Sequence, residues 1–203
     1  MQIKNYDPKR VIISDVDGVL LSWEYAFNEW MQWKGYEPIE DFKSHYSVDT
    51  QYGLTGTASG GLLIREFNES ASMGFIPPLR DSQYYVKLLN EKHQYHFVCL
   101  TSLSSNPYAA ELRRRNLVKL FGDIFLDVIC LDTGADKDED LTKLYTQYGE
   151  CYWIEDKPEN ADAGIAAGFK SLLVEHKHNL EYKGSATVVK NWKEIYNIIK
   201  REN

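Results

Sequence analysis

Hydrophobic and polar positions along the chain follow two periods. Short apolar runs rich in β-branched and aromatic residues have the length of strands: Val11–Ser14, Tyr95–Leu100, Phe125–Leu131, Cys151–Ile154 and Ser171–Val174. Stretches with helical spacing alternate with them: Arg80–Glu91, Pro107–Leu120, Asp138–Tyr148, Pro158–Ala167 and a last helix carrying Trp192, Ile195, Tyr196 and Ile199. Strands that alternate with such helices form a parallel sheet with right-handed crossovers. We therefore predict a three-layer α/β/α, Rossmann-like fold.

Residues 23–76 interrupt this alternation and show no strand pattern. Apolar spacing favours helices over Trp23–Trp33, Ile39–Tyr46 and Leu62–Glu69, and the stretch Gly53–Gly61 holds four glycines. We predict a small helical insertion, called the cap below. Residues 1–22 and 77–203 then form the core domain.

The net charge, the cysteines and the hydropathy of the chain limit the binding partners and the cellular compartment that we expect. The 203 residues carry a formal net charge of -7, which argues against nonspecific binding to nucleic acid or to an anionic membrane. Cys99, Cys130 and Cys151 lie in or beside apolar runs, which is typical of buried reduced thiols. The first ten residues lack the apolar stretch of a signal peptide, and no segment has the length of a membrane span. We expect a cytoplasmic protein.

The segment VIISDVDGVL, residues 11–20, carries the strongest chemical signal. Asp15 follows an apolar strand, and Asp17 lies two residues later, so both carboxylates point the same way. Gly18 allows a sharp backbone turn behind them. Two such acids can hold a divalent cation or divide nucleophilic and proton-transfer work. The alternative is a turn that is merely rich in Asp and Gly.

This run resembles the first motif of the haloacid dehalogenase-like (HAD) superfamily, and the other motifs follow in order. Thr101 ends FVCLTS as in the second motif, Lys137 in GADKDED matches the third, and Asp156 in CYWIEDKPENA matches the fourth. Taken singly, Thr101 could open an ordinary loop, and Lys137 could be one cation in the solvated charge run 136–140. Four ordered motifs on separate strands are far more specific than one. The resemblance covers Val11 to about Val174.

The resemblance implies a Mg²⁺-dependent phosphatase. Asp15 would attack phosphorus and form an aspartyl-phosphate, while Asp17 would act as acid and then base. Thr101 and Lys137 would hold the phosphoryl oxygens. The Asp15 carboxylate, the Asp17 backbone carbonyl and Asp156 would ligate Mg²⁺.

Around these residues the chain departs from the family pattern. Asn160 stands where many members carry a second Asp, and Glu155 stands where others have Gly or Asp. Glu155, Asn160 and Ser102 are candidates for the layer of residues around the metal and phosphate ligands, and the sequence leaves open whether Glu155 and Asn160 touch the metal directly or through bound water. The dehalogenase branch of the superfamily lacks the acid corresponding to Asp17, and the transport ATPases carry Thr there. This acid favours a phosphatase or phosphomutase.

Three functions stay open at this stage. The first is hydrolysis of a small soluble phosphomonoester, with a nucleoside monophosphate favoured because the cap is rich in Trp and Tyr. The second is a phosphatase for nucleic-acid ends, or a phosphomutase, although residues 23–76 show no basic track. The third is a phospholigand-binding protein without catalysis. The sequence names neither the substrate nor the oligomeric state.

Two further groups of residues are interpreted as solvent-facing. His176 and His178 lie two apart after the last predicted core strand, and no third metal ligand is evident. Arg113, Arg114 and Arg115 are consecutive on a predicted helix, so their side chains fan out around its circumference.

Overall fold

The computed structural model describes residues 6–42, 45, 47–55 and 59–201. Its strands are β1 (Val11–Ser14), β2 (His96–Ser102), β3 (Phe125–Leu131), β4 (Tyr152–Glu155), β5 (Lys170–Val174) and β6 (Thr187–Val189). Its α-helices are α1 (Trp23–Trp33), α2 (Val48–Gln51), α3 (Gly60–Asn68), α4 (Ser82–His93), α5 (Pro107–Phe121), α6 (Asp138–Tyr148), α7 (Pro158–Ala167) and α8 (Trp192–Arg201). The short 3₁₀ helices η2 (Ala71–Phe75) and η3 (Lys177–Asn179) complete the elements used below.

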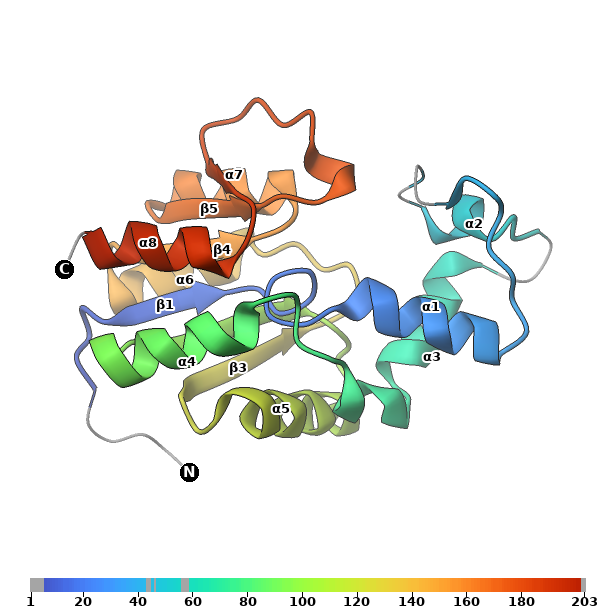
Figure 1. Cartoon of the computed structure of the whole chain (residues 1–203), viewed down its shortest axis with the longest axis horizontal. Coiled ribbons are helices and arrows are strands. Elements are labelled where there is room, and N and C mark those ends of the chain that lie inside the picture. The colour runs from blue at the N-terminus through green and yellow to red at the C-terminus, as the bar shows by residue number, and fades with distance from the viewer. Residues whose placement is uncertain (1–5, 43–44, 46, 56–58, 202–203) are drawn as a thin grey trace.

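The strands form one six-stranded sheet in the order β3-β2-β1-β4-β5-β6, and every pairing is parallel. Helices α4, α5 and α8 cover one face, while α6 and α7 cover the other (Figure 1). β1 lies in the interior of the sheet and is buried on both faces, which explains its uninterrupted apolar sequence. The predicted three-layer fold is confirmed.

The sheet contains one strand more than the sequence pattern predicts. β6 has three residues at the sheet edge, and only Val189 is buried. A strand this short, with one buried side chain, shows no alternation of apolar and polar residues that could be recognised in the sequence.

The predicted helix over Ile39–Tyr46 is wrong at the positions that the structure describes. Residues 40 and 41 form a turn and residue 42 has a 3₁₀ conformation, since the Phe42 N–H donates to the Ile39 carbonyl three residues back, where an α-helix would bond four residues back. Positions 43, 44 and 46 of that prediction lie outside the described residues.

The helices of residues 23–76 lie beyond the carboxyl end of β1 (Figure 1). Trp23, Phe27, Trp30 and Phe67 pack ring against ring, with centroid distances from 4.7 to 6.1 Å. The aromatic side chains of this segment are therefore used for packing, and they are continuous with the apolar core on the face of the sheet covered by α4, α5 and α8.

The chain leaves the core domain and returns to it through two backbone segments that lie side by side. The Ser22 N–H donates to the Pro77 carbonyl at 2.9 Å, and the Leu79 N–H donates to the Leu20 carbonyl at 2.8 Å. The Ser82 hydroxyl also donates to the Leu20 carbonyl. These bonds fix the base of the insertion next to the turn that follows β1. No helix in the described ranges has both the length and the apolar character needed to cross a membrane.

Candidate active site

Asp15 lies where β1 ends, at the edge of the sheet that faces the cap. Its backbone N–H donates to the Ile154 carbonyl at 2.8 Å, so Asp15 is tied to the neighbouring strand β4. Its Oδ1 accepts a hydrogen bond from the Val16 N–H at 2.7 Å, and only 6% of the residue is exposed. The nucleophile candidate is therefore buried and held by backbone on two sides.

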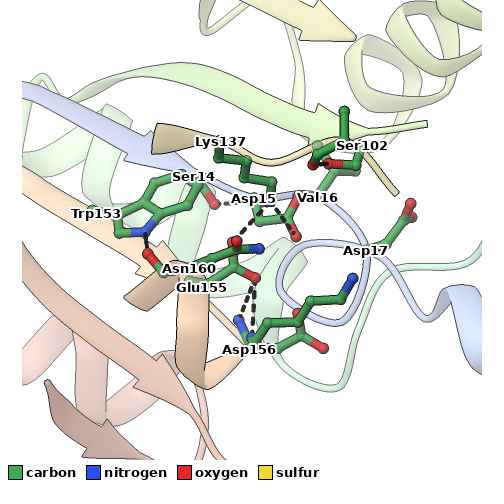
Figure 2. Close-up of polar contacts among 12 residues, drawn as sticks. Ser14, Asp15, Val16, Asp17, Ser102, Lys137, Trp153, Glu155, Asp156 and Asn160 are labelled. Atoms are coloured by element: carbon green, nitrogen blue, oxygen red, sulfur yellow. Dashed lines mark hydrogen bonds and ion pairs between the residues drawn. The ribbon is translucent and has the colours of Figure 1, made fainter. Parts of the chain in front are cut away.

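Lys137 precedes α6 and is buried, not solvated with its charged neighbours. Its Nζ lies 2.9 Å from Asp15 Oδ2 and 2.8 Å from Glu155 Oε2, and 5.2 Å from the centre of the Trp153 ring (Figure 2). Burial alone would lower the pKa of the Lys137 ammonium, but the two carboxylates outweigh burial and raise that pKa above its ordinary value. The lysine thus stays charged beside Asp15.

Glu155 ends β4, and its side chain is fully buried. Its Oε2 pairs with Lys137, and its Oε1 accepts hydrogen bonds from the backbone N–H groups of Asp156 and Lys157 at 3.0 and 3.1 Å. Both carboxylate oxygens are therefore engaged by the protein. Glu155 fixes the position of Lys137 and of the turn that carries Asp156.

Asp15, Glu155 and Asp156 form a carboxylate cluster in which oxygens from all three lie within 4.8 Å of one another (Figure 2). Burial, followed by repulsion from Glu155, raises the pKa of Asp15 to about 6. Burial, followed by repulsion from Asp15, raises the pKa of Asp156 to about 7. Burial also raises the pKa of Glu155. One lysine thus faces three buried acids, and this excess of negative oxygen fits a hard divalent cation.

Gly18 lets Asp156 approach the turn after β1. A Cβ atom on Gly18 would lie 2.3 Å from Asp156 Oδ2, and its φ of +73° is in the left-handed region that favours glycine. The glycine of the DxDG run is required by this contact as well as by the turn.

Asp17 is held by an arginine that the sequence pattern had placed in solvent. Arg113 is fully buried, and its Nη1 and Nη2 donate to the two Asp17 carboxylate oxygens at 2.5 and 2.9 Å. Figure 2 shows the Asp17 side chain pointing away from the group formed by Asp15, Lys137 and Glu155. Burial raises the pKa of Asp17 although the Arg113 guanidinium opposes this effect.

The expectation for Arg113 is wrong because three consecutive residues on a helix do not share one environment. Ala109, Arg113, Asn116 and Leu117 are all buried and lie at helical spacing, so they share the face of α5 that meets the protein. Arg114 and Arg115 have side chains 52% and 73% exposed, as expected. The spacing from Ala109 to Leu117 was the signal that could have identified Arg113.

The remaining predicted residues lie nearby. Thr101 is buried near the carboxyl end of β2, and the Ser102 hydroxyl donates to the Ala135 carbonyl at 2.8 Å, which ties β2 to the loop before Lys137. Asn160 accepts a hydrogen bond from the Trp153 indole N–H through its backbone carbonyl. Of the predicted metal ligands, the Asp15 and Asp156 carboxylates lie together, with Glu155 beside them. Asp17 was expected to contribute its backbone carbonyl, and its carboxylate faces Arg113.

The loop after β5 packs against the site, contrary to the expected solvated loop. The Nε2 atom of His176 lies 2.7 Å from the Gly18 carbonyl, and that of His178 lies 3.0 Å from the Asp156 carbonyl. The Asn179 amide also donates to the Asp156 carbonyl, at 2.7 Å. Burial lowers the pKa of His176 to about 4, so its ring is neutral at neutral pH and donates to Gly18. The loop supports both backbone turns of the carboxylate cluster.

Comparison with solved structures reveals the same arrangement of elements over nearly the whole chain. A HAD family hydrolase from Deinococcus radiodurans with bound phosphate and sodium is 19% identical, covers 96% of each chain and gives a TM-score of 0.59. CbbY from Rhodobacter sphaeroides, in complex with xylulose-1,5-bisphosphate, is 14% identical over 91% of this chain and 95% of its own, with a TM-score of 0.58. The chain has the haloacid dehalogenase-like fold. The L-2-haloacid dehalogenase of Xanthobacter autotrophicus shares this HAD-like fold too, at 9% identity, 94% and 98% coverage and a TM-score of 0.60.

Sequence comparison adds one phage protein. An uncharacterized 32.4 kDa protein from the gp30–rIII intergenic region of Enterobacteria phage T4 is 28% identical over 166 residues. The match covers 76% of this chain and 56% of the phage protein, so the chain spans about half the length of that relative. No protein-family model matches the chain.

Proposed function

We propose that the protein is a Mg²⁺-dependent phosphomonoester hydrolase that uses Asp15 as its nucleophile. The observation that carries this proposal is the placement of Asp15, which lies buried at a strand end between Lys137 and the Asp156 carboxylate. The lysine favours the ionised form of Asp15, which is the form able to attack. The HAD-like fold is shared by phosphatases and dehalogenases, so the fold alone does not choose between them.

The acid at position 17 favours phosphoryl transfer. By the family resemblance of the sequence motifs, the dehalogenase branch lacks an acid at this position, whereas a phosphate ester with a poor leaving group needs a proton donor there. Asp17 follows the nucleophile by two residues and lies next to the base of the cap. This position suits a group that must reach the leaving oxygen of a substrate bound beneath the cap.

The chain's own residues account for each bond change. An Asp15 carboxylate oxygen attacks phosphorus, the bond from phosphorus to the leaving oxygen breaks, and Asp17 gives that oxygen a proton. Water then attacks the phosphorus of the aspartyl-phosphate and passes a proton to Asp17, which frees inorganic phosphate and restores Asp15. Lys137 holds a phosphoryl oxygen through its ammonium, and Thr101 does so through its hydroxyl.

Mg²⁺ would be held by the Asp15 and Asp156 carboxylates and the Asp17 backbone carbonyl, with Glu155 behind them. When bound, the ion neutralises charge on the transferring phosphoryl group. These residues fit Mg²⁺ because all of their donor atoms are oxygens and because Asp15, Glu155 and Asp156 carry more negative charge than Lys137 can neutralise.

For the substrate we propose a small soluble phosphomonoester. Because the aromatic side chains of the cap pack against one another, they give no support to a nucleobase in particular. Nucleoside monophosphates and sugar phosphates therefore enter the test on equal terms.

The test measures phosphate release from nucleotides, sugar phosphates and 3′-phosphorylated oligonucleotides in the presence of Mg²⁺. We expect turnover of at least one small ester, and Asp15→Asn should abolish it because an amide cannot form the acyl phosphate. Asp123→Asn, at an exposed acid away from the site, is the matched control and should retain full activity. Near-normal phosphate release by Asp15→Asn would overturn the proposal.

A further inference from the structure

The Arg113–Asp17 pair is the most deeply buried arginine contact described in the core. Arg113 projects from α5, its side chain is 0% exposed, and both of its terminal nitrogens bond the Asp17 carboxylate, which is 22% exposed. A guanidinium that binds both oxygens of a carboxylate fixes the plane of that carboxylate as well as its position. The geometry therefore restricts the proposed proton-transfer group to one orientation.

The same guanidinium contacts the segment that returns from the cap. Its Nη2 lies 2.8 Å from the Met73 sulfur in η2, and one turn further along α5 the Asn116 amide donates to the Ile76 carbonyl at 2.9 Å. Asp17, on the other side, begins the segment that leads into the cap. Arg113 thus connects the outgoing and returning segments at the base of the insertion.

A purely stabilising role explains this arrangement poorly. The Arg113 Nε has no hydrogen-bond partner among the described residues although it is buried. A buried cation with an unsatisfied donor costs free energy that an apolar side chain of similar volume would avoid. Departures of this kind are expected where a residue serves chemistry.

We propose that Arg113 is a positioning residue that orients Asp17 for proton transfer to the leaving oxygen and ties that orientation to the returning segment of the cap. This inference rests on the proposed phosphatase function and deepens it. The two-point contact is that of ionised Asp17; when Asp17 is protonated, one oxygen keeps a hydrogen bond from Arg113 and the other carries the proton to the leaving oxygen. Proton transfer requires the acid to lie within hydrogen-bond reach of that oxygen, so a freely rotating Asp17 is a poor acid. Arg113 itself does not touch the substrate.

The proposal predicts a dependence on the leaving group. The ratio kcat/KM reports the steps up to departure of the leaving group, where an alkyl phosphate needs a proton and p-nitrophenyl phosphate does not. Arg113→Met keeps the approximate length of the side chain but removes the guanidinium. It should lower kcat/KM for an alkyl phosphate by about 10–10², at or below the low end of the roughly 10²–10⁴ that one acid contributes, because Asp17 itself remains. The value for p-nitrophenyl phosphate should fall less than about threefold, and Arg113→Lys should restore the alkyl value only in part.

Two comparisons exclude a general loss of structure. Arg115→Met, on the exposed side of the same helix, should leave both substrates unchanged. In an Asp17→Asn background, Arg113→Met should cost nothing further on the alkyl ester, because a residue that acts through Asp17 has nothing left to position. Equal losses on both esters, or losses that add in the double variant, would overturn the proposal.

A second measurement separates this inference from the proposed function. Hydrogen exchange of residues 17–21 and 73–79 should accelerate in Arg113→Met and not in Arg115→Met. If wild-type protein releases phosphate from no ester, the phosphatase proposal fails and the proton-transfer role of Arg113 fails with it. If the esters are hydrolysed but exchange and the leaving-group dependence are unchanged in Arg113→Met, only the role of Arg113 is overturned.

Discussion

Removal of Mg²⁺ should make the stability of the protein depend on pH in a defined direction. In the structure, Asp15 and Asp156 have raised pKa values of about 6 and about 7, against an ordinary value of 3.8. An acid whose pKa is raised on folding binds more protons in the folded state than in the unfolded one. The free energy of unfolding without metal therefore falls as pH rises from about 4 to about 7.

The size of this effect follows from the pKa of Asp156, whose side chain is 13% exposed. A shift of roughly three units corresponds to about 4 kcal/mol, of which about 3 kcal/mol are lost between about pH 5 and about pH 8. The pKa shift of Asp15 is not added, because Asp15 and Asp156 belong to one carboxylate cluster and the charge of Asp15 already raises the pKa of Asp156. Because Mg²⁺ binds the ionised carboxylates, the stabilisation that it provides should grow over the same interval by a similar amount.

Urea unfolding at several pH values, in chelator and in excess Mg²⁺, measures both quantities. Asp156→Asn should abolish most of the pH dependence of the difference between the two conditions. His176 adds a pH dependence of its own, since its pKa is lowered from 6.5 to about 4 and the folded state becomes less stable as pH falls from about 6.5 toward 4; this contribution is present in both conditions and cancels in their difference. A stabilisation by Mg²⁺ that is equal at low and high pH would refute the assignment of Asp15 and Asp156 as the metal site.

The remaining predictions concern the metal and four glycines. Ca²⁺ should inhibit turnover that Mg²⁺ supports, because its longer and more numerous contacts let Asp15 bind side-on; equal rates in the two ions, measured after metal stripping, would contradict this. Gly18→Ala should lose more stability in urea than Gly134→Ala, which has a similar φ of +74° but open space around it, and should lose the Mg²⁺-dependent stabilisation; equal costs would show that contact with Asp156 does not matter. Gly60→Ala, whose Cβ would meet α2 atoms at 2.7–3.1 Å, should change relative kcat/KM among natural esters more than for a small aryl phosphate. Gly61→Ala, in open space, should change neither; similar effects of both would exclude α3 packing as the cause.

The features predicted correctly from the sequence are those that local patterns encode. α1, α6 and α7 have the predicted bounds because apolar spacing, a proline at the first turn of α7 and glycines after α6 and α7 mark them locally. The residues at the ends of β1 and β4 meet because parallel strands bring their carboxyl ends to one edge, so Asp15 and Asp156 were predicted together.

What the sequence did not predict depends on contacts between distant segments. Arg113 meets Asp17 across 96 positions, and its burial comes from a helix face whose apolar members are few. His176 reaches Gly18 across 158 positions, from a loop with no regular pattern. A polar side chain on a polar stretch carries no local sign that a distant partner will bury it.

The paired crossings at the base of the insertion also bear on how such a protein can change over evolution. Because the Ser22 N–H already bonds the Pro77 carbonyl at 2.9 Å, the two ends of residues 23–76 meet as closely as the ends of a hairpin. A segment inserted at such a point can be lengthened, shortened or exchanged for another without altering the path of the remaining chain. Asp15, Lys137, Glu155 and Asp156 all lie outside that segment. If the proposed function holds, the residues that carry the reaction and a cap that selects the substrate are encoded in separable stretches of sequence, and selection can act on one while the other stays fixed.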